Sequence, residues 1–257
     1  FSVAACGDDD SDSGSNDSGG SAAQEVPEGQ QGGKIIELAP SGDVDYLDPG
    51  RSYYQFGFQV IDAMHKKLYQ FSPDDATKAK PDLAAEDPEI SEDKKTITVK
   101  LKKGVKFAPP VNREVVAADV KYAIERFFTV NVGGQYTTYF KDIKGAPDTN
   151  SKGFKSFEGI KTPDDHTLVF ELEKPVAVSF AAALTLPISA PVPKEFAEKY
   201  DKKNPSTYNN YVVATGPYMI PNDPKTGKLT GYEAGKIIRL VRNPNWDKSL
   251  DFKPAYV

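Results

Sequence analysis

The sequence predicts a mixed α/β fold, and three patterns carry this prediction. The first is a strand, a turn and a helix in close succession over Lys95–Phe128. The second is a pair of hairpin patterns, over 90–101 and 160–172, in which a charged turn precedes alternating apolar residues. The third is an apolar stripe at helical spacing over Tyr53–Phe71. The 257 residues, 39% of them hydrophobic, suffice for one large domain or two ordinary ones.

The segment Lys95–Phe128 contains the clearest local signals. Its strand alternates apolar with polar residues, as a half-buried strand does. The loop that follows contains Pro109-Pro110, which cannot continue a strand. The helix beyond it has Asp119 in its first turn, where a negative charge suits the helix dipole. Its apolar stripe consists of Val120, Ile124 and Phe127.

The remaining elements follow in chain order. We expect a short strand over Lys34–Leu38, a helix over Tyr53–Phe71, a helix over Glu195–Tyr200 and a strand within Gly235–Asn245. The two hairpins share one construction, which indicates that they lie in one sheet. We also expect a mixed sheet to join the first strand to the segment that begins near Pro187. The stripe of the first helix is Phe56, Val60, Met64 and Leu68.

Residues 7–33 form an acidic Ser/Gly/Asp linker that cannot bury enough apolar surface to fold. This segment contains seven acidic residues and no Lys or Arg. Taking those seven charges from the net charge of −5 leaves +2 for the rest of the chain. A nearly neutral body does not predict a nucleic-acid-binding surface. No segment approaches the ~20 apolar residues of a membrane span.

Motifs of catalysis and cofactor binding are absent from the sequence. His65 falls toward the end of a predicted helix and His166 in a hairpin turn, so the two do not suggest a metal pair. No nucleophile elbow, phosphate-binding loop or dinucleotide fingerprint occurs. We therefore expect no enzymatic activity, no cofactor and no metal.

A series of short motifs occurs in order along about 34–257: Leu47–Pro49, Pro81–Ala84, Lys103–Phe107, Ala117–Val120, Pro191–Lys194, Ala214–Tyr218 and Arg242–Trp246. This ordered set resembles the extracytoplasmic solute-binding proteins of ABC importers, family 5, the oligopeptide-, dipeptide- and nickel-binding group. The sequence departs from the family pattern at several places: Ala108–Val111 replaces an Asp-Gly, Val116 stands where a Thr or Ser usually caps the helix, Asp87-Pro88 lies where a Trp is usual, and Gln135 replaces a Pro.

The resemblance implies a periplasmic-binding-protein-like II fold. By analogy, residues 34–52 and 188–257 form a discontinuous first lobe, and residues 53–187 form the family's additional mixed domain. Relatives continue into a second lobe, which we expect to be missing from this sequence. Two lobes that close on a ligand at a hinge are the implied mechanism.

Ligand-binding residues are also implied by the resemblance. Tyr46 adjoins the family's Leu-Asp-Pro segment at the edge of the cleft, and Tyr136 and Tyr139 match aromatic residues that face the ligand. Thr215 and Gly216 belong to a loop beside the cleft. A packed loop or core tyrosine is an equally good reading of Tyr46, Tyr136 and Tyr139. Trp246 is better explained as a surface anchor of the lobe than as a ligand contact.

Cys6, the only cysteine, follows Val3-Ala4-Ala5 and precedes the acidic linker, which resembles a bacterial lipobox. Lipidation would anchor the protein to the outer face of the cell membrane; a free thiol in the tail is the alternative. The implied function is the solute-binding component of an ABC importer, which captures peptides and delivers them to the permease subunits. A nickel chelate, a sugar or an opine as the solute, and a non-transport surface lipoprotein, remain alternatives.

Overall fold

The computed structural model describes residues 34–37, 42–72 and 74–252, and Glu37–Val257 form one compact unit. Cys6 and the predicted linker at 7–33 lie outside the described residues. The helices are α1 (Gln55–Met64), α2 (Ala117–Phe127), α3 (Ala177–Ala183) and α4 (Lys194–Asp201), with 3-10 turns η1 (Thr137–Tyr139), η2 (Pro187–Ser189), η3 (Tyr208–Asn210) and η4 (Lys248–Leu250). The strands are β1 (Tyr69–Ser72), β2 (Asp75–Pro81), β3 (Glu89–Ile90), β4 (Thr96–Lys100), β5 (Ile160–Asp164), β6 (Thr167–Glu171), β7 (Tyr218–Met219), β8 (Tyr232–Glu233), β9 (Ile237–Ile238) and β10 (Val241–Arg242).

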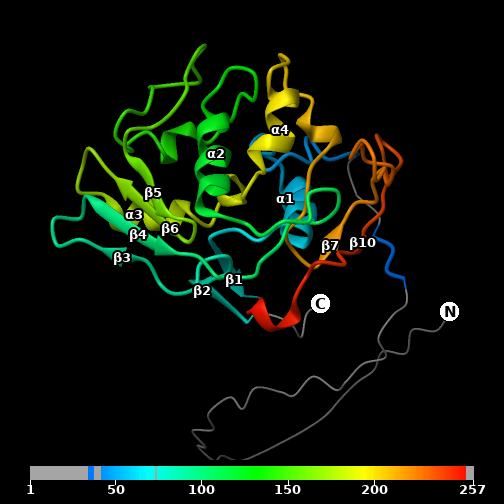
Figure 1. Cartoon of the computed structure of the whole chain (residues 1–257), viewed down its shortest axis with the longest axis horizontal. Coiled ribbons are helices and arrows are strands. Elements are labelled where there is room, and N and C mark those ends of the chain that lie inside the picture. The colour runs from blue at the N-terminus through cyan, green and yellow to red at the C-terminus, as the bar shows by residue number, and fades with distance from the viewer. Residues whose placement is uncertain (1–33, 38–41, 73, 253–257) are drawn as a thin grey trace, which may run out of the picture. The chain divides into compact units, whose positions relative to one another are not determined.

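The two predicted hairpins form one four-stranded antiparallel sheet in the order β3-β4-β6-β5, as expected (Figure 1). At its centre Ile97 lies opposite Phe170, and Val99 lies opposite Leu168. All four of these side chains are buried, because alternate residues of a strand point to the same face. Helix α2 packs against β5 and β6, and α3 packs against β4. The sheet and these helices enclose one part of the core.

Helix α2 confirms the predicted apolar stripe and its acidic first turn. The Asp119 carboxylate accepts the Val116 backbone N–H at 2.9 Å and a bidentate pair of bonds from Arg113 at 2.7 Å. Val116 is the residue before the helix and has no side-chain acceptor of its own. Only one of the two hydrogen bonds of a capping box is therefore present. The Asp119 carboxylate accepts the Val116 N–H, but the Val116 side chain cannot accept the Asp119 N–H in return.

Replacing Val116 with threonine is expected to raise the free energy of unfolding by about 1 kcal/mol, because a hydroxyl at this position can accept a first-turn N–H. Denaturant unfolding of the variant and the wild type measures the change. Val178→Thr is the matched control, because Val178 is exposed and lies inside α3. A gain of equal size in both variants would show that capping is not the cause.

The helix predicted over Tyr53–Phe71 is too long: α1 ends at Met64, and Tyr69 already belongs to β1. The backbone after Met64 donates to side chains that are distant in the sequence. The Lys66 N–H bonds Thr215 Oγ1 at 2.9 Å, and the Leu68 N–H bonds Ser189 Oγ at 3.1 Å. These tertiary hydrogen bonds replace the helical ones. The helix therefore ends at Met64, although the apolar stripe continues to Leu68.

The predicted strand at Lys34–Leu38 is wrong over its described part, because residues 34–37 have no regular structure. The expected mixed sheet between this segment and the region near Pro187 is also wrong for the described residues, since no strand pair joins the two and every strand pair is antiparallel. Side chains make the connection to the later segments instead. Asn209 Oδ1 accepts the Leu47 N–H at 2.6 Å, and Asp43 Oδ2 accepts the Tyr232 hydroxyl at 2.8 Å.

Helix α4 appears where the sequence predicts it. The strand expected within Gly235–Asn245 is present as two short pieces, β9 and β10, of which β10 pairs with β7. Helix α1 lies beside β7 (Figure 1) and also packs against η2. Among the described residues, no helix combines the length and apolar composition that crossing a membrane requires.

Candidate functional site

Tyr53, Tyr136 and Tyr139 form an exposed group of aromatic rings, referred to below as the tyrosine cluster. The rings of Tyr53 and Tyr136 are stacked, with centroids 5.1 Å apart and an interplanar angle of 25°. The ring of Tyr139 lies 6.0 Å from that of Tyr136. Tyr53 is 48% exposed and Tyr139 is 59% exposed. The structure thus brings two of the predicted residues together with a third that the sequence analysis did not select.

The turn before α1 holds Tyr53 in place through Asp45. One oxygen of the Asp45 carboxylate accepts the Ser52 hydroxyl at 2.9 Å. The other accepts the backbone N–H groups of Tyr53 and Tyr54, at 2.5 and 3.2 Å. A carboxylate that receives the N–H groups ahead of a helix is a common way of fixing the start of that helix. These bonds fix the backbone of Tyr53, and so the place from which its ring projects.

Tyr46, the third predicted tyrosine, contacts a different partner. The Arg51 guanidinium lies 4.0 Å from the centre of the Tyr46 ring. Arg51 also donates from Nη1 to the Ser206 carbonyl oxygen at 3.1 Å, which fixes its position over the ring. Tyr46 is half-buried and adjoins Asp45, so it lies at the same end of α1 as the tyrosine cluster.

Thr215 and Gly216 lie at the opposite end of α1. The backbone N–H groups of both residues donate to the Met64 carbonyl oxygen, and Thr215 is fully buried. A Cβ at Gly216 would lie 2.9 Å from the Met64 carbonyl carbon, so the close approach requires glycine. Ten residues of α-helix span roughly 15 Å. The five predicted site residues therefore fall into two groups, one at each end of α1.

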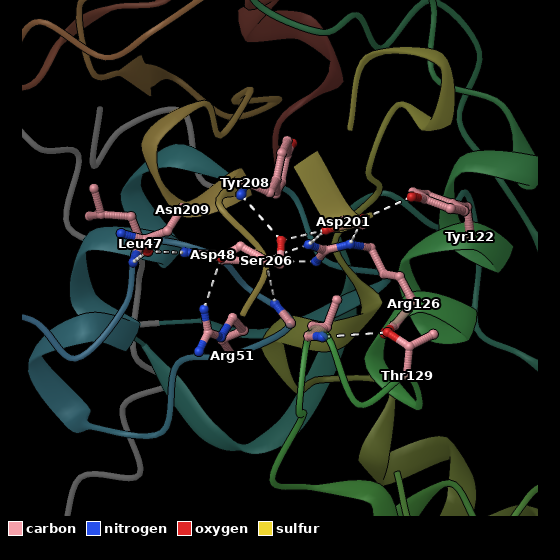
Figure 2. Close-up of polar contacts among 12 residues, drawn as sticks. Leu47, Asp48, Arg51, Tyr122, Arg126, Thr129, Asp201, Ser206, Tyr208 and Asn209 are labelled. Carbon is pink, nitrogen blue, oxygen red and sulfur yellow. Dashed lines mark hydrogen bonds and ion pairs between the residues drawn. The ribbon is translucent and has the colours of Figure 1, made fainter. Parts of the chain in front are cut away.

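A buried ion network connects three segments that are distant in the sequence (Figure 2). The Arg126 guanidinium makes bidentate bonds to Asp48, at 2.7 and 2.8 Å, and to Asp201, at 2.7 Å for both bonds. Its side chain is 2% exposed. Tyr122 and Ser206 donate their hydroxyls to Asp201 at 2.8 and 2.6 Å. The loop before α1, helix α2 and the end of α4 are thus held together by one cation.

The pKa values of this network follow from its geometry. Burial alone would lower the pKa of Arg126, but the charges of Asp48 and Asp201 outweigh that effect and raise it. Burial would likewise raise the pKa of Asp201, yet its hydrogen bonds and the Arg126 charge hold it below its usual range. Each buried charge is therefore compensated, as it must be in a low-dielectric interior.

A second buried cation lies beside Thr215. Lys66 Nζ pairs with Asp82 Oδ1 at 2.9 Å and with Asp251 Oδ2 at 3.0 Å, and all three side chains are nearly inaccessible to solvent. Trp246 donates its indole N–H to the same Asp251 oxygen at 3.0 Å. These contacts hold the 246–251 segment against the core. Trp246 stays a predicted anchor of the lobe surface, and its bond to Asp251 is the contact that would serve this role.

His65 is buried at the end of α1, and neither ring nitrogen has a hydrogen-bond partner in the described part of the chain. Burial lowers its pKa to about 3. Because the unfolded state binds the proton near pH 6.5, it takes up a proton before the folded state does. Stability is therefore lost as the pH falls from about 6.5 toward 3, by at most about 1.4 kcal/mol per pH unit.

We expect His65→Leu to reduce the loss of stability between pH 7 and pH 5 by about 2 kcal/mol. Urea unfolding of the variant and the wild type at both pH values measures this loss. His166→Asn is the matched control, because His166 is partly exposed in a hairpin turn. An unchanged pH dependence in His65→Leu would contradict the prediction.

Solved structures of solute-binding proteins share this fold. Clavulanic acid biosynthesis oligopeptide binding protein 2 superposes with a TM-score of 0.68 and 28% identity, over 82% of this chain and 36% of that one. A structure of Listeria monocytogenes OppA bound to peptide gives a TM-score of 0.62 and 26% identity, over 81% and 39%. The periplasmic-binding-protein-like fold is therefore confirmed, and this chain corresponds to between 36% and 39% of the length of these two structures.

Residues 78–256 match the family model of the bacterial extracellular solute-binding proteins, family 5, and the chain belongs to this family. Protein XP55 of Streptomyces lividans is 28% identical over 222 residues, 85% of this chain and 34% of that protein. The dipeptide-binding protein of Escherichia coli K12 is 32% identical over 159 residues, 56% of this chain and 27% of that protein. The chain thus spans about a third of the length of the relatives it matches. The Escherichia coli dipeptide-binding protein, and the periplasmic oligopeptide-binding protein OppA of the same organism, which is 32% identical over 51% of this chain, are binding proteins by name. This fits the expectation of a protein without enzymatic activity.

Sequence reasoning missed Tyr53 and both buried ion networks. The Tyr53-Tyr54 pair directly before α1 was a usable signal, since two adjacent aromatic residues at a helix start cannot both be buried in the helix stripe. Arg126 and Lys66 offered no such signal. Charged residues at these positions are ordinarily solvated, and their acidic partners are 16 to 185 residues away.

Proposed function

We propose that this chain is part of the extracytoplasmic, lipid-anchored solute-binding component of an ABC importer, which captures peptides and delivers them to permease subunits. Membership of family 5 supports an extracytoplasmic binding role. Relatives named as dipeptide-binding and oligopeptide-binding proteins support peptides as the solute. The observation that carries the proposal is the tyrosine cluster: exposed aromatic rings with polar hydroxyls offer contact area to varied peptides at a low cost in side-chain entropy.

Residues 34–52 and 188–257 would form the first lobe of this receptor, and residues 53–187 its additional domain. The Arg126 network supports this arrangement, because it ties the α2 segment of the additional domain to Asp48 and Asp201, one in each piece of the lobe. The three segments would then move as one body when the receptor closes on its ligand.

The proposed ligand contacts are Tyr46, Tyr136 and Tyr139 at one end of α1. Thr215 and Gly216 would contribute by holding their loop against the end of α1, since their backbone N–H groups donate to the Met64 carbonyl oxygen and the Thr215 hydroxyl accepts the Lys66 N–H. Lipidation of Cys6 would anchor the receptor to the membrane. Mass spectrometry of the precursor expressed in a bacterial host tests that part, and an unmodified Cys6 would refute it.

Calorimetry with tripeptides tests peptide binding on the full-length gene product. We expect micromolar or tighter binding to that protein. Binding to residues 1–257 alone should be at least tenfold weaker, because this chain spans about a third of its relatives' length and the proposed mechanism needs a second lobe to close on the ligand. Tyr136→Ala should weaken binding by about tenfold in the full-length protein, given the energy typical of a buried aromatic contact. Tyr211→Phe is the control, since Tyr211 stacks on Tyr200, away from the cluster.

An opine is a second candidate for the solute. AgaA, solved in complex with agropinic acid, is 29% identical to this chain with a TM-score of 0.56, over 72% of this chain. Binding of agropinic acid in preference to every tripeptide would support this candidate and would overturn the peptide assignment.

A further inference from the structure

Tyr53 extends the tyrosine cluster into a wall of rings at the start of α1. It stacks on Tyr136, and the ring of Phe58, in α1, lies 6.1 Å from the ring of Tyr136. Because Tyr53 covers one face of Tyr136, a ligand meets the outer face of Tyr53 and the ring of Tyr139. Both of these rings are about half exposed. The wall therefore presents electron-rich aromatic faces to solvent.

The charge near this wall is negative. Burial raises the pKa of Tyr136, and the neighbouring Tyr53, Tyr139 and Asp45 add to this effect, which places the Asp45 charge within electrostatic range of the rings. In the described part of the chain, the Asp45 carboxylate accepts the Ser52 hydroxyl and the N–H groups of Tyr53 and Tyr54, and no cation pairs with it. An aromatic face beside a carboxylate attracts a cation more strongly than either group alone.

Arginine–aromatic stacking is a recurrent feature of this protein. Within the described residues no lysine or arginine lies over a ring of the tyrosine cluster. Elsewhere four of the five arginines of the chain lie over aromatic rings, at 4.0 to 5.1 Å from the ring centre. The cluster thus offers rings of the type that these pairs use, and no cation of the described residues covers them. The four pairs are Arg51 with Tyr46, Arg113 with Phe107, Arg126 with Tyr208 and Arg242 with Tyr218.

We propose that the tyrosine cluster is a subsite for a planar cationic side chain of the bound peptide, of the kind that arginine carries, with Tyr53 as the residue that determines this specificity. The inference rests on the proposed peptide-binding function. A guanidinium stacks flat on the outer face of Tyr53, turns its edge toward Asp45 and keeps its remaining N–H groups in water. A lysine ammonium would gain the charge interaction without the stacking.

Binding of seven tripeptides to the full-length gene product tests this subsite by calorimetry. The set is trialanine and three peptides with arginine at each position in turn, and each arginine peptide has a citrulline counterpart of the same shape without the charge. We expect one arginine peptide to bind about three- to tenfold more tightly than its citrulline counterpart. Tyr53→Leu should abolish this preference, and Tyr53→Phe should retain it because the ring face remains.

Tyr54→Leu is the matched control: Tyr54 is the adjacent and more exposed residue, and its ring is 6.5 Å from Tyr53 in an edge-on arrangement. It should leave the preference for arginine unchanged. If no tripeptide binds, the proposed function fails and the subsite with it. If trialanine, citrulline and arginine peptides bind equally, peptide binding stands and the subsite is refuted. A preference that survives both Tyr53→Leu and Tyr139→Leu would place the cation elsewhere and refute the assignment to this cluster.

Discussion

Arg126→Met is expected to lower the free energy of unfolding by about 3–5 kcal/mol, because the variant leaves the Asp48 and Asp201 carboxylates buried without their cation. Asp48 is fully buried and Asp201 is 10% exposed at its side chain, so water cannot replace the guanidinium without opening the structure. Denaturant unfolding at pH 7 measures the loss. The destabilisation should shrink as the pH falls and Asp201 takes up a proton, because protonation removes one uncompensated charge.

Lys202→Met is the matched control for this variant. Lys202 pairs with Glu198 at 3.9 Å, and both side chains are at least half exposed. An exposed pair of this kind contributes less than about 0.5 kcal/mol. Equal destabilisation by the two variants would contradict the prediction. Replacing Arg126, Asp48 and Asp201 together by apolar residues should recover much of the loss, since no buried charge is then left unpaired.

Lys66→Met is expected to cost a similar 3–5 kcal/mol, because two buried carboxylates, Asp82 and Asp251, lose their shared cation. Burial alone would lower the pKa of Lys66, but the two carboxylates raise it, so the group is charged in the folded protein. Its removal should also free the segment that Asp251 holds. Trp246 donates to Asp251 and is the only tryptophan of the chain, which makes its fluorescence a local probe.

The fluorescence of Trp246 should therefore change at a lower denaturant concentration than the far-ultraviolet circular dichroism in Lys66→Met, while the two signals coincide in the wild type. Lys236→Met is the control, because its pair with Glu233 is exposed. If Lys66→Met unfolds at the same denaturant midpoint as the wild type, the triad does not stabilise the fold.

Local patterns in the sequence determined a large part of this fold. The two hairpins and the sheet they share follow from alternation of apolar residues, and α2 follows from a stripe with spacings of three and four. Tyr136 and Tyr139 were selected by their resemblance to aromatic residues of the family, and their rings lie 6.0 Å apart in the structure. Alternation and spacing are properties of adjacent residues, so they can be read without knowing the tertiary structure.

Only the tertiary structure decided where α1 ends, which ring stacks on Tyr136 and which charges are buried. Helix α1 stops at Met64 because Thr215 and Ser189, more than 120 residues away, accept the next backbone N–H groups. Tyr53 lies against Tyr136 because Asp45 fixes the turn before the helix. Arg126 and Lys66 look like surface residues in the sequence and are buried because carboxylates from distant segments compensate their charges. Each of these features depends on a contact with a residue that is distant in the sequence. Contacts between distant residues produce no periodic pattern in the sequence, so they cannot be predicted from local patterns.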